Sequence, residues 1–244
     1  MKYDLNHCTN LLKERKLILI CDLDDTLISS IYLDDNYSNS NFDESIVVAS
    51  TETQINNKHI HIKLRPYLTD FLEKMSKIFE LHLMSTGKEI HVKRCLDVID
   101  PSRKYFGDRI ISRENIVKSK NKAKTKEEMF DGCSNIIICL DDNLDVWNHS
   151  PTVINIKPLN YFYSLKLIKR RFANKERLKI YIKDYFGCLE MHSEDNNLLT
   201  LQSLLKEYHE DFFKVFDEGN SDKTRIMLPD IGQIMGYPRN AIKI

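Results

Sequence analysis

The sequence predicts an α/β fold in which helices flank an open parallel sheet. Two short apolar runs have the composition of buried strands, at Leu17–Cys21 and Ile136–Leu140, and a third strand is expected at Phe79–Met84, directly after an amphipathic helix. Helical stretches lie between the second and third strands in chain order, at roughly 88–99 and 124–130. This alternation of strands and helices is typical of a parallel sheet with helices on its faces.

The composition narrows the function classes. The chain has 244 residues, 42% of them hydrophobic and 30% charged, so it can bury a core. Lys and Arg number 36 and Asp and Glu also number 36, which disfavours a protein that holds nucleic acid by bulk charge. No apolar run approaches the roughly 18 residues of a membrane span. We therefore expect neither direct nucleic-acid binding nor membrane insertion.

The N-terminus and the cysteines indicate whether the protein works in a reducing or an oxidising compartment. Residues 1–10 are polar and precede a charged run at 13–16, so a secretory signal is not expected. The six cysteines include no C-x-x-C pair. These features predict a reducing compartment and neither a zinc site nor a disulfide framework.

The first strand is followed by a long polar segment. Ser29 to Lys58 is rich in Asn, Asp and Ser, and residues 59–62 then alternate as His-Ile-His-Ile, so we expect a loop or flap with a short hairpin. A helix follows, with apolar positions at Leu68, Phe71, Leu72, Met75 and Ile78.

The C-terminal third predicts a helical appendage. Leu165–Phe186 and Asn197–Asp217 both have helical apolar spacing, and Asp195 or Asn196 could cap the second helix. The apolar stripe of that helix comprises Leu198, Leu201, Leu205, Tyr208, Phe212 and Phe216.

Polar side chains follow each of the three strands. Parallel sheets bind ligands beyond the carboxyl ends of their strands. The sequence therefore predicts that the side chains that follow these strands meet in one crevice, namely Asp22, Asp24, Ser85, Asp141 and Asp142.

The acidic motif Asp22-Leu23-Asp24-Asp25-Thr26 predicts a chemistry for that crevice. Two carboxylates at i and i+2 after a strand suit a nucleophile and an acid/base on one side of a turn. Several carboxylates in one crevice repel one another unless a cation neutralises them. Oxygen ligands of this kind suit Mg²⁺, which we expect as the cofactor.

The motif and several later segments resemble the Fcp/Scp-type phosphatases of the haloacid dehalogenase superfamily, in particular the larger Fcp branch. The later segments are Lys63-Leu64-Arg65-Pro66, Phe106 to Arg113, Asp141-Asp142 and Asp145-Val146-Trp147. Their order and spacing agree over about residues 15–162. The resemblance implies a haloacid-dehalogenase-like parallel sheet flanked by helices, with a flap insertion and a C-terminal helical appendage.

The resemblance also implies a division of the chain. Residues 1–162 correspond to a catalytic phosphatase domain, and residues 163–244 to the helical appendage and a C-terminal tail. The larger branch continues into a BRCT domain, which we expect this chain to lack.

Roles for individual residues follow from the resemblance. Asp22 is the expected nucleophile, and Asp24 the acid that protonates the leaving oxygen and later deprotonates water. Ser85 would hydrogen-bond a phosphoryl oxygen. Lys124 best fits the lysine that pairs with the phosphoryl charge, with Lys122 and Lys126 as alternatives, and Asp141 would orient it.

The remaining expected contacts concern the metal and the substrate. Asp22, the backbone carbonyl of Asp24 and Asp142 would hold Mg²⁺, while Thr26 and Arg65 are candidate substrate-binding residues. Like-charge repulsion should raise the pKa of Asp24, whereas Mg²⁺ and the lysine should keep Asp22 ionised.

The function that this resemblance implies is removal of phosphate from phosphoserine in the C-terminal repeat domain of RNA polymerase II. The phosphorylated repeat domain is then the expected partner, with general transcription factors as further candidates and the nucleus as the location. Two alternatives stay open: a phosphatase for another phosphoprotein or a small metabolite, and a catalytically silent binding module.

Overall fold

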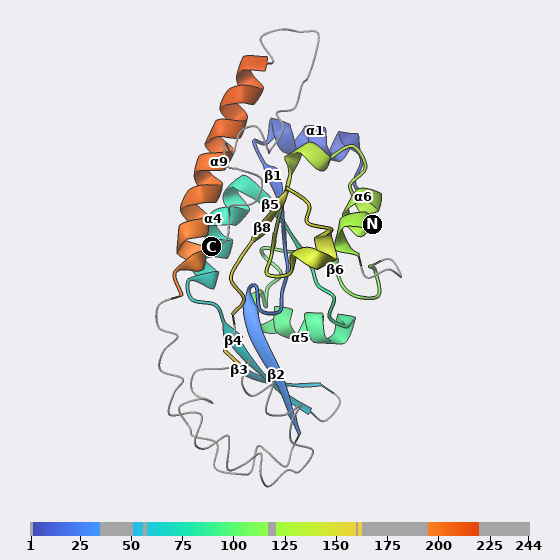
Figure 1. Cartoon of the computed structure of the whole chain (residues 1–244), viewed down its shortest axis with the longest axis vertical. Helices are drawn as coiled ribbons and strands as arrows, with labels where there is room; N and C mark the ends of the chain where they lie inside the picture. Colours follow the sequence, from blue (N-terminus) through green and yellow to red (C-terminus); the bar gives the residue numbers. More distant parts are fainter. Residues whose placement is uncertain are drawn as a thin grey trace.

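The structure is a computed structural model (Figure 1). It describes residues 2–34, 51–55, 58–116, 121–159, 161–162 and 195–219.

A five-stranded parallel sheet forms the centre of the molecule. Its strands are β1 (Leu17–Cys21), β5 (Phe79–Met84), β6 (Ile110–Ile111), β7 (Ile137–Asp141) and β8 (Val153–Asn155). They lie in the order β6-β5-β1-β7-β8, and every neighbouring pair is parallel. All five side chains of β1 and of β7 are buried, as expected for central strands covered on both faces. The predicted α/β class is confirmed.

Four helices cover this sheet. They are α1 (Leu5–Lys13), α4 (Leu68–Ile78), α5 (Glu89–Ile99) and α6 (Lys122–Met129). Helix α4 buries four of its five predicted apolar positions. Helix α6 begins two residues before the predicted start, because the Asn121 side chain caps it by accepting from the Lys124 N–H.

The predicted flap contains more regular structure than expected. Strands β2 (Ile28–Asp34), β3 (Thr51–Ile55) and β4 (Lys58–Leu64) form an antiparallel sheet in the order β2-β4-β3. The hairpin expected at 59–62 is part of β4, which pairs with both neighbours. This sheet projects from the core beside α5 (Figure 1). Residues 35–50, 56 and 57 of the predicted flap lie outside the described residues.

Helix α9 (Asn197–Gly219) confirms the second helix predicted for the appendage. It runs along α4 at the side of the molecule (Figure 1), and Asp195 accepts a hydrogen bond from the Asn197 N–H. Its predicted stripe faces the core, with Phe216 partly buried and the other members fully buried. The helix expected at 165–186 lies outside the described residues, so the boundary at residue 162 stays a prediction. No helix in the described part of the chain has the length and apolar character of a membrane span.

The cysteines correct one expectation. Cys8 on α1 and Cys133, in the turn before β7, form a disulfide with a Cα–Cα distance of 5.8 Å. The sequence predicts no disulfide framework and does not reveal this single pair, because the two residues are 125 positions apart in sequence and local spacing carries no sign of their proximity. The free cysteines Cys21, Cys95 and Cys139 are buried.

Candidate active site

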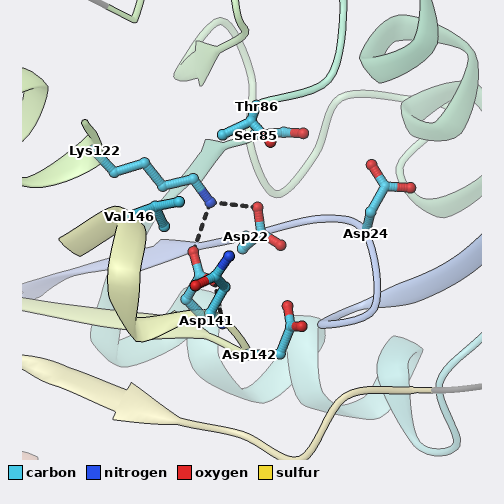
Figure 2. Close-up of a pocket in the computed structure, with 9 residues that line it drawn as sticks. Asp22, Asp24, Ser85, Thr86, Lys122, Asp141, Asp142 and Val146 are labelled. Carbon is cyan, nitrogen blue, oxygen red and sulfur yellow. Dashed lines mark hydrogen bonds and ion pairs between the residues drawn. The ribbon is translucent and has the colours of Figure 1, made fainter. Parts of the chain in front are cut away.

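One pocket lies beyond the carboxyl ends of β1, β5 and β7. Its volume is about 160 Å³, and all five side chains that were expected to meet there line it. The lining comprises Asp22, Asp24, Ser85, Thr86, Lys122, Asp141, Asp142, Asn143 and Val146. Figure 2 shows Asp22 between Lys122 and Asp24, with Ser85 and Thr86 on one side and Asp141 and Asp142 on the other.

Lys122 bridges two carboxylates at the base of the pocket. Its Nζ donates to Asp22 Oδ1 at 2.5 Å and to Asp141 Oδ2 at 2.6 Å (Figure 2). Asp141 is held on both oxygens, since Trp147 Nε1 donates to Oδ2 at 2.7 Å and the Asn143 N–H donates to Oδ1 at 2.8 Å. Asp141 therefore orients the lysine, the part the resemblance implied for it.

The choice of Lys124 as the lysine of the site is wrong. Its side chain is 61% exposed and lies 3.9 Å from Glu128, on the outer face of α6. Lys122, named as an alternative, is 1% exposed and reaches the pocket. The other alternative, Lys126, is buried but donates to Thr152 at 3.2 Å. Residues i and i+4 share a helix face, so Lys122 and Lys126 point inward together while Lys124 points out.

Burial and charge act against each other at this bridge. Burial raises the pKa of Asp22 well above its usual value, Lys122 opposes that shift, and Asp141 adds to it. Burial alone would lower the pKa of Lys122, but Asp22 and Asp141 raise it above its usual value. Burial, followed by the charge of Asp141, raises the pKa of Asp142 to about 6. The pocket thus holds more carboxyl groups than Lys122 alone can balance once they are ionised.

The donor set fits a divalent cation. Carboxylate oxygens of Asp22, Asp141 and Asp142 lie within 4.8 Å of one another. Since both oxygens of Asp141 already accept hydrogen bonds, Asp22 and Asp142 are the better placed ligands. The part expected of the Asp24 carbonyl stays a prediction.

The turn after β1 directs the two motif carboxylates. Asp25 has a φ of 60°, and its N–H donates to the Ile28 carbonyl at 2.6 Å, so the chain reverses into β2 directly after the motif. Asp25 tolerates this left-handed conformation better than most side chains do. Asp22 and Asp24 can therefore both line the pocket.

Thr26 and Arg65 do not line the pocket, so their expected contact with substrate is corrected. The buried Thr26 hydroxyl donates to Asp142 Oδ1 at 3.0 Å and accepts from the Asp142 N–H at 3.1 Å, so Thr26 positions Asp142. The Arg65 guanidinium is buried and donates to the carbonyls of Asp25 and Lys157 at 3.1 and 2.6 Å. Arg65 therefore supports the turn behind the site.

Sequence reasoning missed the groups that surround Asp24. Ser30 Oγ on β2 donates to Asp24 Oδ1 at 2.7 Å, and His91 Nε2 on α5 lies 3.0 and 2.9 Å from its two oxygens. The sequence did contain a signal that His91 faces inward, because His91 falls on the same face of the predicted helix at 88–99 as the apolar Cys95 and Val98.

Comparison with known proteins places the chain in a family. The model of the NLI interacting factor-like phosphatases matches residues 17–166. The chain belongs to this family. That membership confirms the resemblance to the Fcp/Scp-type phosphatases inferred from the motifs.

Two curated relatives are named as phosphatases of the RNA polymerase II C-terminal domain. The protein from Caenorhabditis elegans is 28% identical, over 96% of this chain and 33% of its own length. The protein from Schizosaccharomyces pombe is 31% identical, over 67% of this chain and 24% of its own length. The chain thus spans a third or less of the length of these relatives.

Solved structures share the fold. The structure of Fcp1, described as an essential RNA polymerase II CTD phosphatase, matches with a TM-score of 0.76 and 24% identity, over 94% of this chain and 72% of that one. Fission yeast Fcp1 bound to beryllium fluoride matches with a TM-score of 0.73. The predicted haloacid-dehalogenase-like fold class is confirmed.

Proposed function

We propose that this chain is a Mg²⁺-dependent protein serine/threonine phosphatase that acts on phosphoserine in the C-terminal repeat domain of RNA polymerase II. The observation that carries the proposal is the pocket itself: Asp22 is hydrogen-bonded to the buried Lys122, and Asp24 lies across the same opening. A nucleophile, a fixed cation and a separate acid are the groups that an aspartate-based phosphoryl transfer requires.

The first chemical step forms an aspartyl-phosphate. A carboxylate oxygen of Asp22 attacks phosphorus as the bond to the serine oxygen breaks, and Asp24 gives its proton to that oxygen. Lys122 Nζ and the Ser85 hydroxyl lie where they can bind the phosphoryl oxygens. Because Lys122 is already held by Asp22 and Asp141, it needs little reorganisation to stabilise the developing charge.

The second step regenerates the enzyme. Asp24 takes a proton from water as the water oxygen attacks phosphorus, and the bond to Asp22 breaks to release inorganic phosphate. Asp24 therefore acts as acid and then as base, which general acid–base catalysis permits for one well-placed carboxyl.

The metal site belongs to the same pocket. Asp22 and Asp142 would hold Mg²⁺, together with the Asp24 carbonyl, and Thr26 keeps the Asp142 carboxylate in place. Bound Mg²⁺ supplies positive charge to the phosphoryl oxygens and offsets repulsion between the phosphate and the carboxylates.

The substrate assignment rests on the relatives. Proteins named RNA polymerase II C-terminal domain phosphatases match over most of this chain, and we extend their named substrate to it. Its partners would then be the phosphorylated repeat domain and general transcription factors, and its location the nucleus. The pocket holds the expected nucleophile, the expected acid and a buried lysine, which favours an enzyme over a silent binding module.

The test is phosphate release from a phosphorylated repeat-domain peptide, with and without Mg²⁺. The native chain should release phosphate when Mg²⁺ is present, Asp24→Asn should lower the rate by about 10²–10⁴-fold, and the exposed Asp211→Asn should leave it unchanged. Hydrolysis of a small aryl phosphate without hydrolysis of the peptide would support a different substrate. If neither is hydrolysed, the binding module becomes the better interpretation.

A further inference from the structure

The Asp24 side chain is held by residues from two elements outside the acidic motif. His91 on α5 is 6% exposed, and its Nε2 lies 3.0 and 2.9 Å from the two carboxyl oxygens of Asp24. The Tyr32 hydroxyl on β2 lies 2.7 Å from Nδ1 of the same imidazole. Both ring nitrogens of His91 are therefore engaged, one by the pocket and one by the flap.

The absence of a side chain at Gly87 leaves space for the His91 ring. Gly87 lies three residues after the end of β5, and a Cβ on Gly87 would lie 2.9 Å from His91 Cδ2. Contacts that short require a shift of the neighbouring atoms, so a side chain at position 87 would displace the imidazole or the backbone beside it. One turn further along α5, Cys95 Sγ lies 3.7 Å from Nε2 and limits movement on the other side.

The two ring nitrogens of His91 fix its orientation between the flap and the pocket. Nε2 lies within hydrogen-bond distance of both carboxyl oxygens of Asp24, and Nδ1 lies within hydrogen-bond distance of the Tyr32 hydroxyl, which can donate or accept. The ring therefore connects β2 to the side chain of Asp24.

We propose that His91 is a positioning residue that holds the Asp24 carboxyl toward the leaving oxygen, with Tyr32 setting the orientation of its ring. This inference rests on the proposed function, because it assigns His91 a part in the proton transfer by Asp24. It also links the flap sheet to the acid of the reaction, since β2 supplies both Ser30 and Tyr32.

The first test uses the dependence of the rate on the leaving group. An acid contributes most when the departing oxygen is strongly basic, so kcat/KM is measured with phenyl phosphate, whose leaving group has a pKa of about 10, and with 2,4-dinitrophenyl phosphate, whose leaving group is a much weaker base. His91→Leu should lower kcat/KM for phenyl phosphate by about ten-fold or more and for the dinitrophenyl ester by less than about two-fold.

Matched variants separate positioning from a general disturbance of the fold. His91→Gln keeps an N–H donor near the position of Nε2 and should recover most of the loss. Tyr32→Phe should show a smaller loss with the same dependence on the leaving group. Lys93→Gln alters the exposed face of the same helix and should leave both rates unchanged. Equal losses for both esters in His91→Leu, or no recovery in His91→Gln, would overturn the proposal.

The second test does not depend on activity. In a crystal structure of His91→Leu, Asp24 should adopt a different side-chain rotamer from that in the native chain, whereas an unmoved carboxyl would contradict a positioning role. A native chain that hydrolyses neither the esters nor the repeat-domain peptide with Mg²⁺ would refute the proposed function, and the crystal structure would still decide whether His91 positions Asp24.

Discussion

Two partly buried polar clusters lie at opposite ends of strand β5, and they balance charge differently. At the carboxyl end, the pocket combines Asp22, Asp24, Asp141 and Asp142 with one cation among its described lining residues, Lys122. At the other end, one carboxylate is held by two imidazoles. We call this second group the Glu80 cluster; it comprises Tyr3, His7, Glu80, His82 and Phe130.

The members of the Glu80 cluster hold one another through hydrogen bonds and ring contacts. Glu80 Oε1 accepts from His7 Nε2 at 2.9 Å and from His82 Nε2 at 2.7 Å. The Tyr3 ring stacks on Phe130 at a centroid distance of 4.8 Å and meets His82 edge-on at 5.0 Å. In this cluster two imidazoles face one carboxylate, whereas in the pocket four carboxylates face one lysine among the described lining residues. An excess of carboxylates over fixed cations, rather than burial alone, therefore indicates the ligand site.

The largest expected effect is a loss of activity when Lys122 is replaced, which replacement of Lys124 should not cause. Lys122→Ala removes the fixed cation of the pocket and should lower kcat/KM for an aryl phosphate by about 10³-fold or more. Lys124→Ala alters the exposed face of the same helix and should leave the rate within about two-fold of native. Steady-state kinetics on both variants measures this, with circular dichroism as the control for folding. A large loss in Lys124→Ala would contradict the assignment of the lysine.

The second effect tests the excess charge directly. Mg²⁺ at 100 times its dissociation constant should raise the free energy of unfolding by about 2.7 kcal/mol, because it binds the folded pocket. Asp142→Asn should require much more Mg²⁺ for the same rise, whereas the exposed control Glu114→Gln should respond like the native chain. Denaturant titrations at several Mg²⁺ concentrations measure this. If Mg²⁺ does not change the free energy of unfolding of the native chain, the pocket does not differ from the Glu80 cluster in needing a cation.

The third effect concerns the Glu80 cluster. Glu80→Gln weakens two hydrogen bonds to a charged group and should lower the free energy of unfolding by about 1–2 kcal/mol at pH 7, without changing kcat/KM. Urea unfolding measures it, with the exposed Glu210→Gln as control. A large loss of activity in Glu80→Gln would show that the two ends of β5 are not independent.

The same cluster predicts a dependence of stability on pH. Burial raises the pKa of Glu80, but the hydrogen bonds from His82 and His7 outweigh it and lower the pKa from 4.5 to about 2. A lowered pKa in the folded state means that the unfolded state binds more protons, so this stabilisation is complete above pH 4.5 and is lost as the pH falls toward 2. In Glu80→Gln the free energy of unfolding should lack this part of its pH dependence. The same pH dependence in the variant and the native chain would contradict the prediction.

The smallest effect lies outside both clusters. Tyr67 precedes α4 with a φ of 65°, a conformation that is costly for a bulky side chain. Since Tyr67 is 48% exposed, Tyr67→Gly loses little packing and should raise the free energy of unfolding by about 0.5–1 kcal/mol. The measurement is urea unfolding of the variant beside the native chain. A destabilised Tyr67→Gly would mean that packing of the ring outweighs the strain.

The parts of the fold that could be predicted from the sequence are those with local signals. Unbroken apolar runs identify β1 and β7, and a segment of mainly apolar residues after a helix identifies β5. Parallel topology then brings Asp22, Ser85 and Asp141 to one edge. Strands β6 and β8 have two and three residues, too few for a periodic signal.

The parts that could not be predicted depend on distant contacts. Thr26 meets Asp142 across 116 positions, and Arg65 meets Lys157 across 92, so neither partner is visible in a local motif. The lysine was open to a better prediction: placing the helix start at the Asn121 cap puts Lys122 and Lys126 on one face and Lys124 on the other.

The central claim is that Asp22 becomes phosphorylated, and chemical trapping tests it most directly. During turnover of an aryl phosphate with Mg²⁺, sodium borohydride would reduce an aspartyl-phosphate to homoserine and release phosphate, and peptide mass spectrometry would then locate the modified residue. The account predicts homoserine at position 22 in the native chain and none in Asp22→Asn. Homoserine at another aspartate, or sustained turnover without any trapped residue, would contradict it.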